Sequence, residues 1–168
     1  MSLLVRTVFN KPWIPYENKV EFYLCDSRKE FPAPVTTVHG FFFDDEKRIL
    51  LVEHYKRGWE VPGGHIEEGE GFEEAMHREL LEETQAISGP LNQLGFLKKI
   101  ALEEKPADCT YPHPESYCLF YSGRINKKSP FKGDDHIVAA EYFTLESARE
   151  NAWIQAYKEY FDAALESL

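Results

Sequence analysis

The sequence predicts an α+β fold, an α/β/α sandwich around a mixed β-sheet, and three observations support that prediction. First, the 168 residues are enough for a single hydrophobic core of ordinary size. Second, most apolar residues fall in short β-branched or aromatic runs, which are typical of strands. Third, only two segments are helical by composition, one in the middle of the chain and one at its end. Strand runs that surround an interior helix and lead to a terminal one favour this architecture.

The first segment, residues 1–34, is expected to be an N-terminal elaboration of the domain formed by residues 35–168. Prolines punctuate this segment around one short apolar stretch, Val20 to Cys25, which could be a strand or a hairpin arm. Val35 to Phe43 and Arg48 to His54 are both rich in β-branched and aromatic residues. The polar residues between these two runs predict a hairpin with a four-residue turn.

The segment after this hairpin, Trp59 to Gly64, is expected to be short, extended and ended by a tight loop. Pro62 fixes its own φ, and Gly63 and Gly64 permit positive φ. Phe72 to about Gln85 is helical by composition. The remaining elements are strands at residues 91–102, 117–125 and 137–143, then Thr144 as an N-cap and a helix over residues 145–165 that is broken near Asn151.

The composition excludes several classes of protein. No apolar run approaches the ~18–20 residues that span a bilayer, and the N-terminal residues lack a secretion signal, so we expect a cytoplasmic protein without a membrane partner. Cys25, Cys109 and Cys118 match neither a disulfide framework nor a zinc site. A net charge of −10 without a large basic cluster argues against a nucleic-acid polymer, whereas a small phosphorylated ligand could bind through a metal ion.

The negative charge is concentrated in one segment. Residues 67–83 contain eight glutamates and one basic residue, Arg78, and therefore carry −7 of the net −10. Glu79, Glu82 and Glu83 are spaced i, i+3, i+4, which places three carboxylates within an arc of ~100° on a helix, where they repel. A solvated acidic face is one interpretation. The other is a site for Mg²⁺ or Mn²⁺, which prefer oxygen ligands and would relieve the repulsion.

The residues before this helix favour the metal site. Gly64 ends a turn whose backbone can approach a ligand closely, and the guanidinium of Arg78 can tie a loop carboxylate such as Glu70 to the helix. The pattern Gly64-x5-Glu70-x7-Arg78-Glu79-Leu80-x-Glu82-Glu83 resembles the Nudix box, the signature of the Nudix hydrolases, at seven of its nine specified positions.

Two positions depart from that signature. Gln85 stands where the family has glycine, and Ala86 stands where it has a bulky aliphatic residue. Because glycine normally helps this helix to end, we expect the helix to end slightly later, at Ser88-Gly89-Pro90. Ile87 is expected to fill the place of the aliphatic residue.

The resemblance covers about residues 33–166 and implies a Nudix-like α/β/α sandwich with the loop-helix-loop Nudix motif. It implies a hydrolase that uses Mg²⁺ or Mn²⁺ to cleave the diphosphate of a nucleoside diphosphate linked to some group X, such as a canonical or oxidised nucleoside triphosphate. By position in the motif, the metal ligands would be the Gly64 carbonyl, Glu79, Glu83 and, directly or through a second layer of contacts, Glu82. Glu70 and Arg78 would brace the motif.

The motif does not determine the general base or the residues that choose the substrate. Candidates for the base or an extra ligand, besides the glutamates of the motif, are Glu103, Glu104, Glu115, Asp134, Asp135 and His136. Lys56 and Arg57 could touch phosphate or be exposed turn residues. Five aromatic residues could stack on a base or belong to the core: Trp13, Trp59, Tyr111, Tyr117 and Trp153.

Three functions remain open at this point. The first is the hydrolase of a small nucleotide, the second is a Nudix-like binding or sensing domain without turnover, and the third is isomerisation of an isoprenyl diphosphate. The complete set of acidic residues favours the hydrolase over the second function, and no cysteine is placed for the third. A second copy of the chain could pack on residues 1–34 to form a homodimer.

Overall fold

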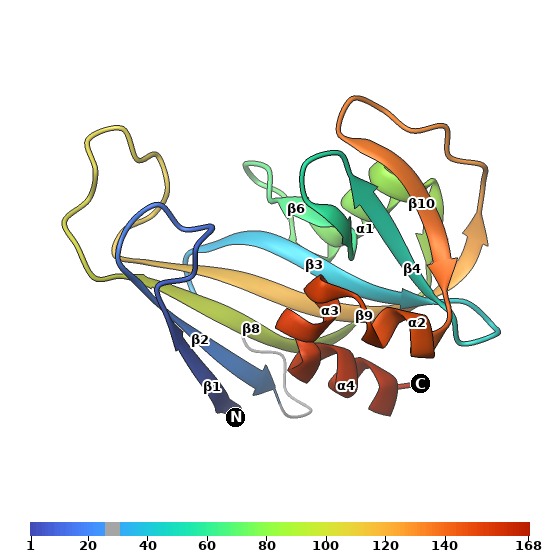
Figure 1. The fold of residues 1–168 in the computed structure, drawn as a ribbon, viewed down its shortest axis with the longest axis horizontal. Coiled ribbons are helices and arrows are strands. Elements are labelled where there is room, and N and C mark those ends of the chain that lie inside the picture. The colour runs from blue at the N-terminus through green and yellow to red at the C-terminus, as the bar shows by residue number, and fades with distance from the viewer. Residues whose placement is uncertain (26–30) are drawn as a thin grey trace.

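The computed structural model of the protein describes residues 1–25 and 31–168. Its centre is a mixed sheet with the strand order β1-β2-β8-β9-β3-β4-β10, to which β5, β6 and β7 add short pairings with β4, β3 and β9 (Figure 1). The strands are β1 Ser2–Phe9, β2 Asn18–Cys25, β3 Val35–Phe43, β4 Ile49–His54, β5 Gly58–Glu60, β6 Gly63–His65, β7 Ala86–Ser88, β8 Asn92–Ala101, β9 Glu115–Lys128 and β10 Ile137–Phe143.

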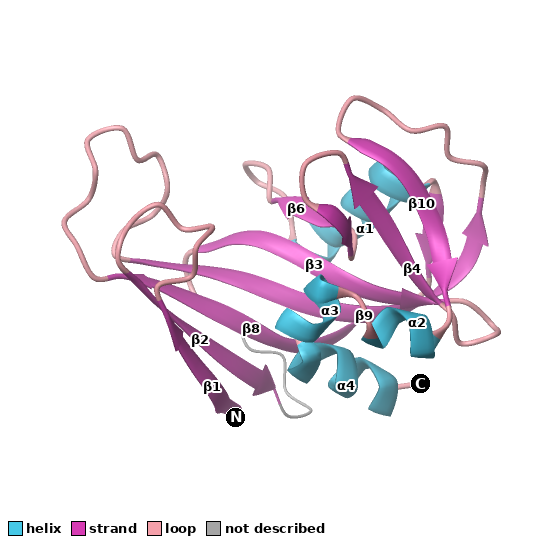
Figure 2. Cartoon of the chain, in the orientation of Figure 1, coloured by secondary structure: helices cyan, strands magenta, loops and turns pink. Residues whose placement is uncertain are grey.

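Helices cover the two faces of this sheet, which makes the molecule a three-layer α/β/α sandwich (Figure 2). The helix α1 (Phe72–Thr84) covers one face, and α2 (Leu145–Arg149), α3 (Ala152–Ala156) and α4 (Lys158–Glu166) cover the other. Two separate hydrophobic cores follow from strand alternation, because successive side chains of a strand point to opposite faces. In β3, Phe42 packs beneath α1, whereas Phe41 and Phe43 pack beneath α2–α4. The α+β prediction is confirmed.

The strands predicted from β-branched and aromatic runs are all present. β3 has the predicted bounds, β3 and β4 are antiparallel neighbours, and the parallel pairing of β3 with β9 makes the sheet mixed. The N-terminal segment forms two strands, of which β1 was not predicted, and its hairpin extends the sheet beside β8. Within the described part of the chain, no helix combines the length and apolar character needed to cross a membrane.

The C-terminal helical region is interrupted twice. Thr144 is the predicted N-cap, and its hydroxyl accepts a hydrogen bond from the Ser147 amide at 3.2 Å. The predicted break near Asn151 is confirmed, because the Asn151 side chain caps α3 by accepting from the Ile154 amide at 3.0 Å. A second break at Tyr157 was not predicted. These short helices depend on packing against the sheet, since isolated helices of this length are marginal in water.

The helix α1 has the bounds expected from composition, Phe72 to about Gln85, and does not continue to Ser88-Gly89-Pro90. Gln85 adopts the left-handed conformation, with φ 56°, and its amide bonds to the Leu81 carbonyl at 2.9 Å, so Thr84 and not Gly89 ends the helix. A non-glycine residue in this conformation costs roughly 1–2 kcal/mol, and the Gln85 side chain offsets part of that by donating to the same carbonyl at 3.1 Å. The expectation for Ile87 was also wrong. Ala86 is the buried residue, while Ile87 is 52% exposed.

Candidate active site

The Nudix-like motif forms around two consecutive glycines of β6. This strand pairs with β3, where His39 faces Gly63 and Val38 faces Gly64. The Gly63 amide donates a hydrogen bond to Glu83 Oε2 at 3.0 Å. At Gly64, a Cβ atom would lie 2.4 Å from Glu79 Oε1. The two carboxylates of α1 therefore lie directly against the backbone of β6.

Burial makes these two carboxylates costly to ionise. It raises the pKa of Glu83 to about 8, and the nearby charges of Glu79 and Glu60 raise it further against the opposing effect of the Gly63 hydrogen bond. Burial also raises the pKa of Glu79, although Arg78 opposes that shift. Glu82 differs, because its side chain is 59% exposed and pairs with Arg78 at 3.2 Å. Glu79 and Glu83 are thus the desolvated pair of the site.

Arg78 connects α1 to the loop before it and to β6. Its Nε and Nη2 atoms donate to the two carboxylate oxygens of Glu70 at 2.7 and 2.9 Å, and Nη2 also donates to the His65 carbonyl at 2.9 Å. Its Nη1 atom donates to Glu79 at 3.0 Å. The hydrogen bonds to Arg78 hold the pKa of Glu70 below its usual range. This guanidinium fork connects the loop before α1, the strand β6 and the acidic face of the helix.

The donor atoms around β6 suit a hard divalent cation. Two desolvated carboxylates converge beside the Gly64 backbone, and the space that a Cβ would fill at Gly64 is taken by the Glu79 carboxylate. Among residues 1–25 and 31–168, no three acidic, histidine or cysteine side chains are already gathered as a finished metal cluster. Arg78 and the Gly63 amide hold the carboxylates instead. Carboxylate oxygens are the type of ligand that Mg²⁺ and Mn²⁺ prefer, and a metal held here would take the place of the ion pair between Glu79 and Arg78.

The two glycines are needed for close contact and not for unusual backbone angles. The glycines with positive φ are Gly58, Gly69 and Gly133, so the expectation that Gly63 and Gly64 serve a turn with positive φ was wrong. A Cβ at Gly63 would lie 2.3 Å from the Val38 carbonyl oxygen, which is backbone in a paired strand. At Gly64 it would meet a side chain that can move.

This difference predicts opposite outcomes for two neighbouring alanine substitutions. Gly63→Ala should lower the free energy of unfolding by about 1–3 kcal/mol, because the β3 backbone cannot yield to the new methyl group. Gly64→Ala should change it by less than about 1 kcal/mol but displace Glu79 and lower kcat/KM by roughly a hundredfold. Urea unfolding and steady-state kinetics measure the two effects. Equal losses of stability in both variants would contradict the assignment of Gly64 to the site.

The basic residues before the motif are only partly free to touch phosphate. Arg57 donates from Nη2 and Nε to the Glu60 carboxylate at 2.6 and 3.1 Å, and so already has a partner. Lys56 is exposed, with its ammonium 5.1 Å from the centre of the Tyr55 ring. Glu60 itself is only 8% exposed and raises the pKa of Glu83. Sequence reasoning passed over Glu60, although a glutamate within an apolar extended segment was a visible signal.

The six candidates for the general base lie on two loops and a strand. Glu103 accepts from the Glu17 amide at 3.0 Å, and Glu115 pairs with Lys98 at 2.7 Å. Asp134 accepts from the amides of His136 and Ile137. No hydrogen bond or ion pair within the described ranges joins these residues, or Glu104 and Asp135, to the glutamates of α1. The structure therefore leaves the general base open.

The loop that carries Glu103 and Glu104 does reach β6 at another point. Tyr111 lies on this loop, and its hydroxyl is 2.7 Å from His65 Nε2, one residue after Gly64. His113 Nε2 contacts the Glu103 carbonyl at 2.8 Å, which ties the base of the loop together. Long loops of this kind often form one wall of an active site.

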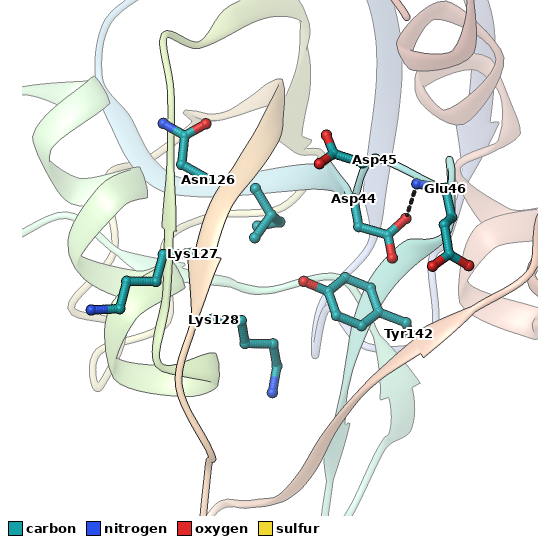
Figure 3. A pocket seen from close by; sticks show the side chains of 8 residues that line it. Asp44, Asp45, Glu46, Asn126, Lys127, Lys128 and Tyr142 are labelled. Carbon is teal, nitrogen blue, oxygen red and sulfur yellow. Dashed lines mark hydrogen bonds between the residues drawn. The ribbon is translucent and has the colours of Figure 1, made fainter.

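One hollow of the described structure lies away from the motif. Its volume is about 290 Å³, and it is formed by the β3–β4 turn, the end of β9 and Tyr142 of β10 (Figure 3). Acidic residues of the turn and lysines of β9 both line it, and Arg124 pairs with Asp45 at 3.0 Å. None of the residues that line it belongs to the Nudix-like motif. The candidate site at β6 and α1 therefore lies outside this hollow.

Comparison with known proteins supports the resemblance of the motif. The model of the NUDIX domain matches residues 33–163. YtkD of Bacillus subtilis (strain 168), whose name assigns it a proposed 8-oxo-dGTP diphosphatase activity, is 34% identical over 160 residues, with 83% of this chain and 96% of that protein covered.

Solved structures agree with this match. The Bacillus subtilis pyrophosphohydrolase BsRppH is 25% identical, has a TM-score of 0.69, and shares 91% of this chain and 94% of its own. A Nudix hydrolase from Nitrosomonas europaea is 26% identical, has a TM-score of 0.54, and shares 80% of this chain and 95% of its own. The matched region contains every residue of the motif, from Gly64 to Ala86. The chain therefore belongs to the Nudix family.

Proposed function

We propose that this protein is a Mg²⁺- or Mn²⁺-dependent pyrophosphohydrolase that cleaves the diphosphate linkage of a small nucleotide, most specifically a canonical or oxidised nucleoside triphosphate. The observation that carries the proposal is the desolvated pair Glu79 and Glu83 beside Gly64. Two like charges held in a dry site are unfavourable unless a cation neutralises them. The names of YtkD and BsRppH, a proposed 8-oxo-dGTP diphosphatase and a pyrophosphohydrolase, support the same reaction class.

In this proposal each residue of the motif has one task. Glu79, Glu83, the Gly64 carbonyl and Glu82 would hold the metal, which neutralises charge on the diphosphate and lowers the pKa of bound water. Arg78 and Glu70 fix the helix relative to β6. The low polarity that raises the pKa of Glu83 also strengthens its attraction to a cation. The protein mainly positions and polarises the reacting groups.

A substrate panel with product identification tests the proposal. The protein is incubated with canonical nucleoside triphosphates, 8-oxo-dGTP and several nucleoside diphosphate derivatives, with and without Mg²⁺ or Mn²⁺, and the products are separated. We expect metal-dependent release of pyrophosphate or phosphate from at least one of these nucleotides. Tight nucleotide binding without any release would overturn the proposal in favour of a sensing domain.

A further inference from the structure

The strand β6 offers a single side chain by which the rest of the molecule can hold it. Its three residues are Gly63, Gly64 and His65, so two of them present backbone alone. The strand is short and its pairing is with β3. Three residues paired with one neighbour are a weak restraint. A strand that is to offer the Gly64 carbonyl to a metal ion therefore needs further contacts to fix its position.

Side chains of α1 supply some of these contacts through the backbone of β6. The Gly63 amide donates to Glu83 Oε2 at 3.0 Å, and the His65 carbonyl accepts from Arg78 Nη2 at 2.9 Å. Both partners belong to the same helix. These hydrogen bonds hold the strand toward α1 and leave its opposite side to be held from elsewhere.

The side chain of His65 points to that opposite side. A Cβ at Gly64 would meet the Glu79 carboxylate of α1. Because side chains alternate along a strand, Gly63 and His65 face the other way. A Cβ at Gly63 would lie 2.7 Å from the His39 ring, which packs on the side of the sheet that α3 covers. His65 therefore directs its side chain away from the glutamates, although its own backbone adjoins them.

Tyr111 contacts β6 from this side. Its hydroxyl lies 2.7 Å from His65 Nε2, and the two rings are tilted with their centres 5.7 Å apart. Tyr111 belongs to the loop that joins β8 to β9, and this loop is itself anchored. Glu103 accepts from the Glu17 amide at 3.0 Å, and the Glu103 carbonyl contacts His113 Nε2 at 2.8 Å. A hydroxyl on an anchored loop can restrain the strand that it touches.

We propose that Tyr111 is a positioning residue of the metal site. Its hydroxyl holds His65, and through His65 the adjoining Gly64 carbonyl, where the glutamates of α1 can share a cation with it. Arg78 and Tyr111 thus restrain β6 from opposite sides. Groups that orient metal ligands contribute to the affinity for the metal. The inference rests on the proposed function and extends it to a residue outside the motif.

Tyr111→Phe tests this assignment, with Tyr55→Phe as the matched control. Each variant removes one hydroxyl from an exposed tyrosine beside a histidine ring, and the ring of Tyr55 lies 5.1 Å from that of His54, outside the motif. The dissociation constant of Mn²⁺ is measured without nucleotide, from the electron paramagnetic resonance of the free ion. We expect it to rise about three- to tenfold in Tyr111→Phe, the effect of one hydrogen bond, and to stay constant in Tyr55→Phe.

A double-mutant cycle shows whether Tyr111 acts through His65. His65→Ala should weaken Mn²⁺ binding at least as much as Tyr111→Phe does. Adding Tyr111→Phe to His65→Ala should then change the dissociation constant less than about twofold, because the hydroxyl has already lost its partner. Equal Mn²⁺ affinity in the wild type and Tyr111→Phe, or the same loss with and without the His65 side chain, would overturn the assignment.

Two further measurements separate positioning from a general structural role. In a chelator, the melting temperature of Tyr111→Phe should lie within about 2 °C of the wild type, because the contact is exposed. At saturating Mn²⁺, its kcat should lie within about twofold of the wild type, since the charge at the site is unchanged. A larger fall in the melting temperature of the chelated variant would mark a structural role and overturn the assignment.

The wild-type protein separates this inference from the proposed function. A wild type that binds no Mn²⁺ and releases no product from the nucleotide panel refutes the proposed function. A wild type that binds Mn²⁺ and turns over, with an unchanged Mn²⁺ affinity in Tyr111→Phe, refutes only the role of Tyr111.

Discussion

Replacing Glu83 with glutamine is expected to lower kcat/KM for the best substrate by at least about 10²–10³, the usual loss when a group that stabilises transition-state charge is removed. The carboxylate lies against Gly63 at 3.0 Å and is largely withdrawn from water. Glutamine keeps its size but cannot supply the negative charge that a divalent ion needs. The double variant Glu79→Gln with Glu83→Gln should lose essentially all metal-dependent hydrolysis, as product release over time will show.

Stability measurements separate this loss from misfolding. Because burial raises the pKa of Glu83 to about 8, its ionised form is disfavoured in the metal-free protein. At pH 9 the neutral amide of Glu83→Gln should therefore raise the melting temperature above that of the wild type. The control is Glu68→Gln, which removes one charge from an exposed loop residue and should change neither activity nor stability. Intact Mg²⁺-dependent hydrolysis in the double variant would refute the metal assignment.

The parts of the fold that local signals determine could be predicted from the sequence. The run Val35–Phe43 forms a strand with the predicted bounds, since β-branched and aromatic residues favour a half-buried extended chain. Thr144 and Asn151 cap helices at the predicted places. The first strand could not be predicted in this way. Its residues are mostly exposed, and it is defined by antiparallel pairing with β2, which no local pattern contains.

The end of α1 keeps the turn of the family pattern although the glycine that usually forms it is absent. The family pattern places glycine at position 85 because the chain turns there in a left-handed conformation, and the protein retains that turn with glutamine at φ 56°. Sequence reasoning assumed that a change of residue would move the turn. The adjacent burial of Ala86 instead keeps the chain in place, and a small side chain fits where a larger one was expected.

The candidate site was predictable where its residues share one helix and unpredictable where they come from different strands. Helical spacing alone places Glu79 and Glu83 together. The contribution of Glu60 depends on β5 lying near α1, which no local pattern contains.

Magnesium is expected to raise the melting temperature, and to do so more strongly at alkaline pH. At a hundred times the dissociation constant, binding to the folded state alone adds about 2.7 kcal/mol, or roughly 5–10 °C for a domain of this size. Below pH 8 the metal must displace the proton of Glu83. The dissociation constant of the metal therefore rises about tenfold for each pH unit below 8. At the same Mg²⁺ concentration, the gain at pH 6.5 should fall to about 1 kcal/mol, or roughly 2–4 °C.

In the metal-free protein, the contribution of Glu83 to stability should instead fall as the pH rises. An acid whose pKa is higher in the folded state than in the unfolded chain binds its proton more tightly when folded, so it contributes stability at low pH. For Glu83 that contribution is lost as the pH rises from about 4.5 to about 8. The difference in melting temperature between wild type and Glu83→Gln, measured in a chelator across this range, isolates the group from all other titrations. A difference that stays constant with pH, or a melting temperature that Mg²⁺ leaves unchanged at pH 8.5, would show that Glu83 is not a desolvated metal ligand.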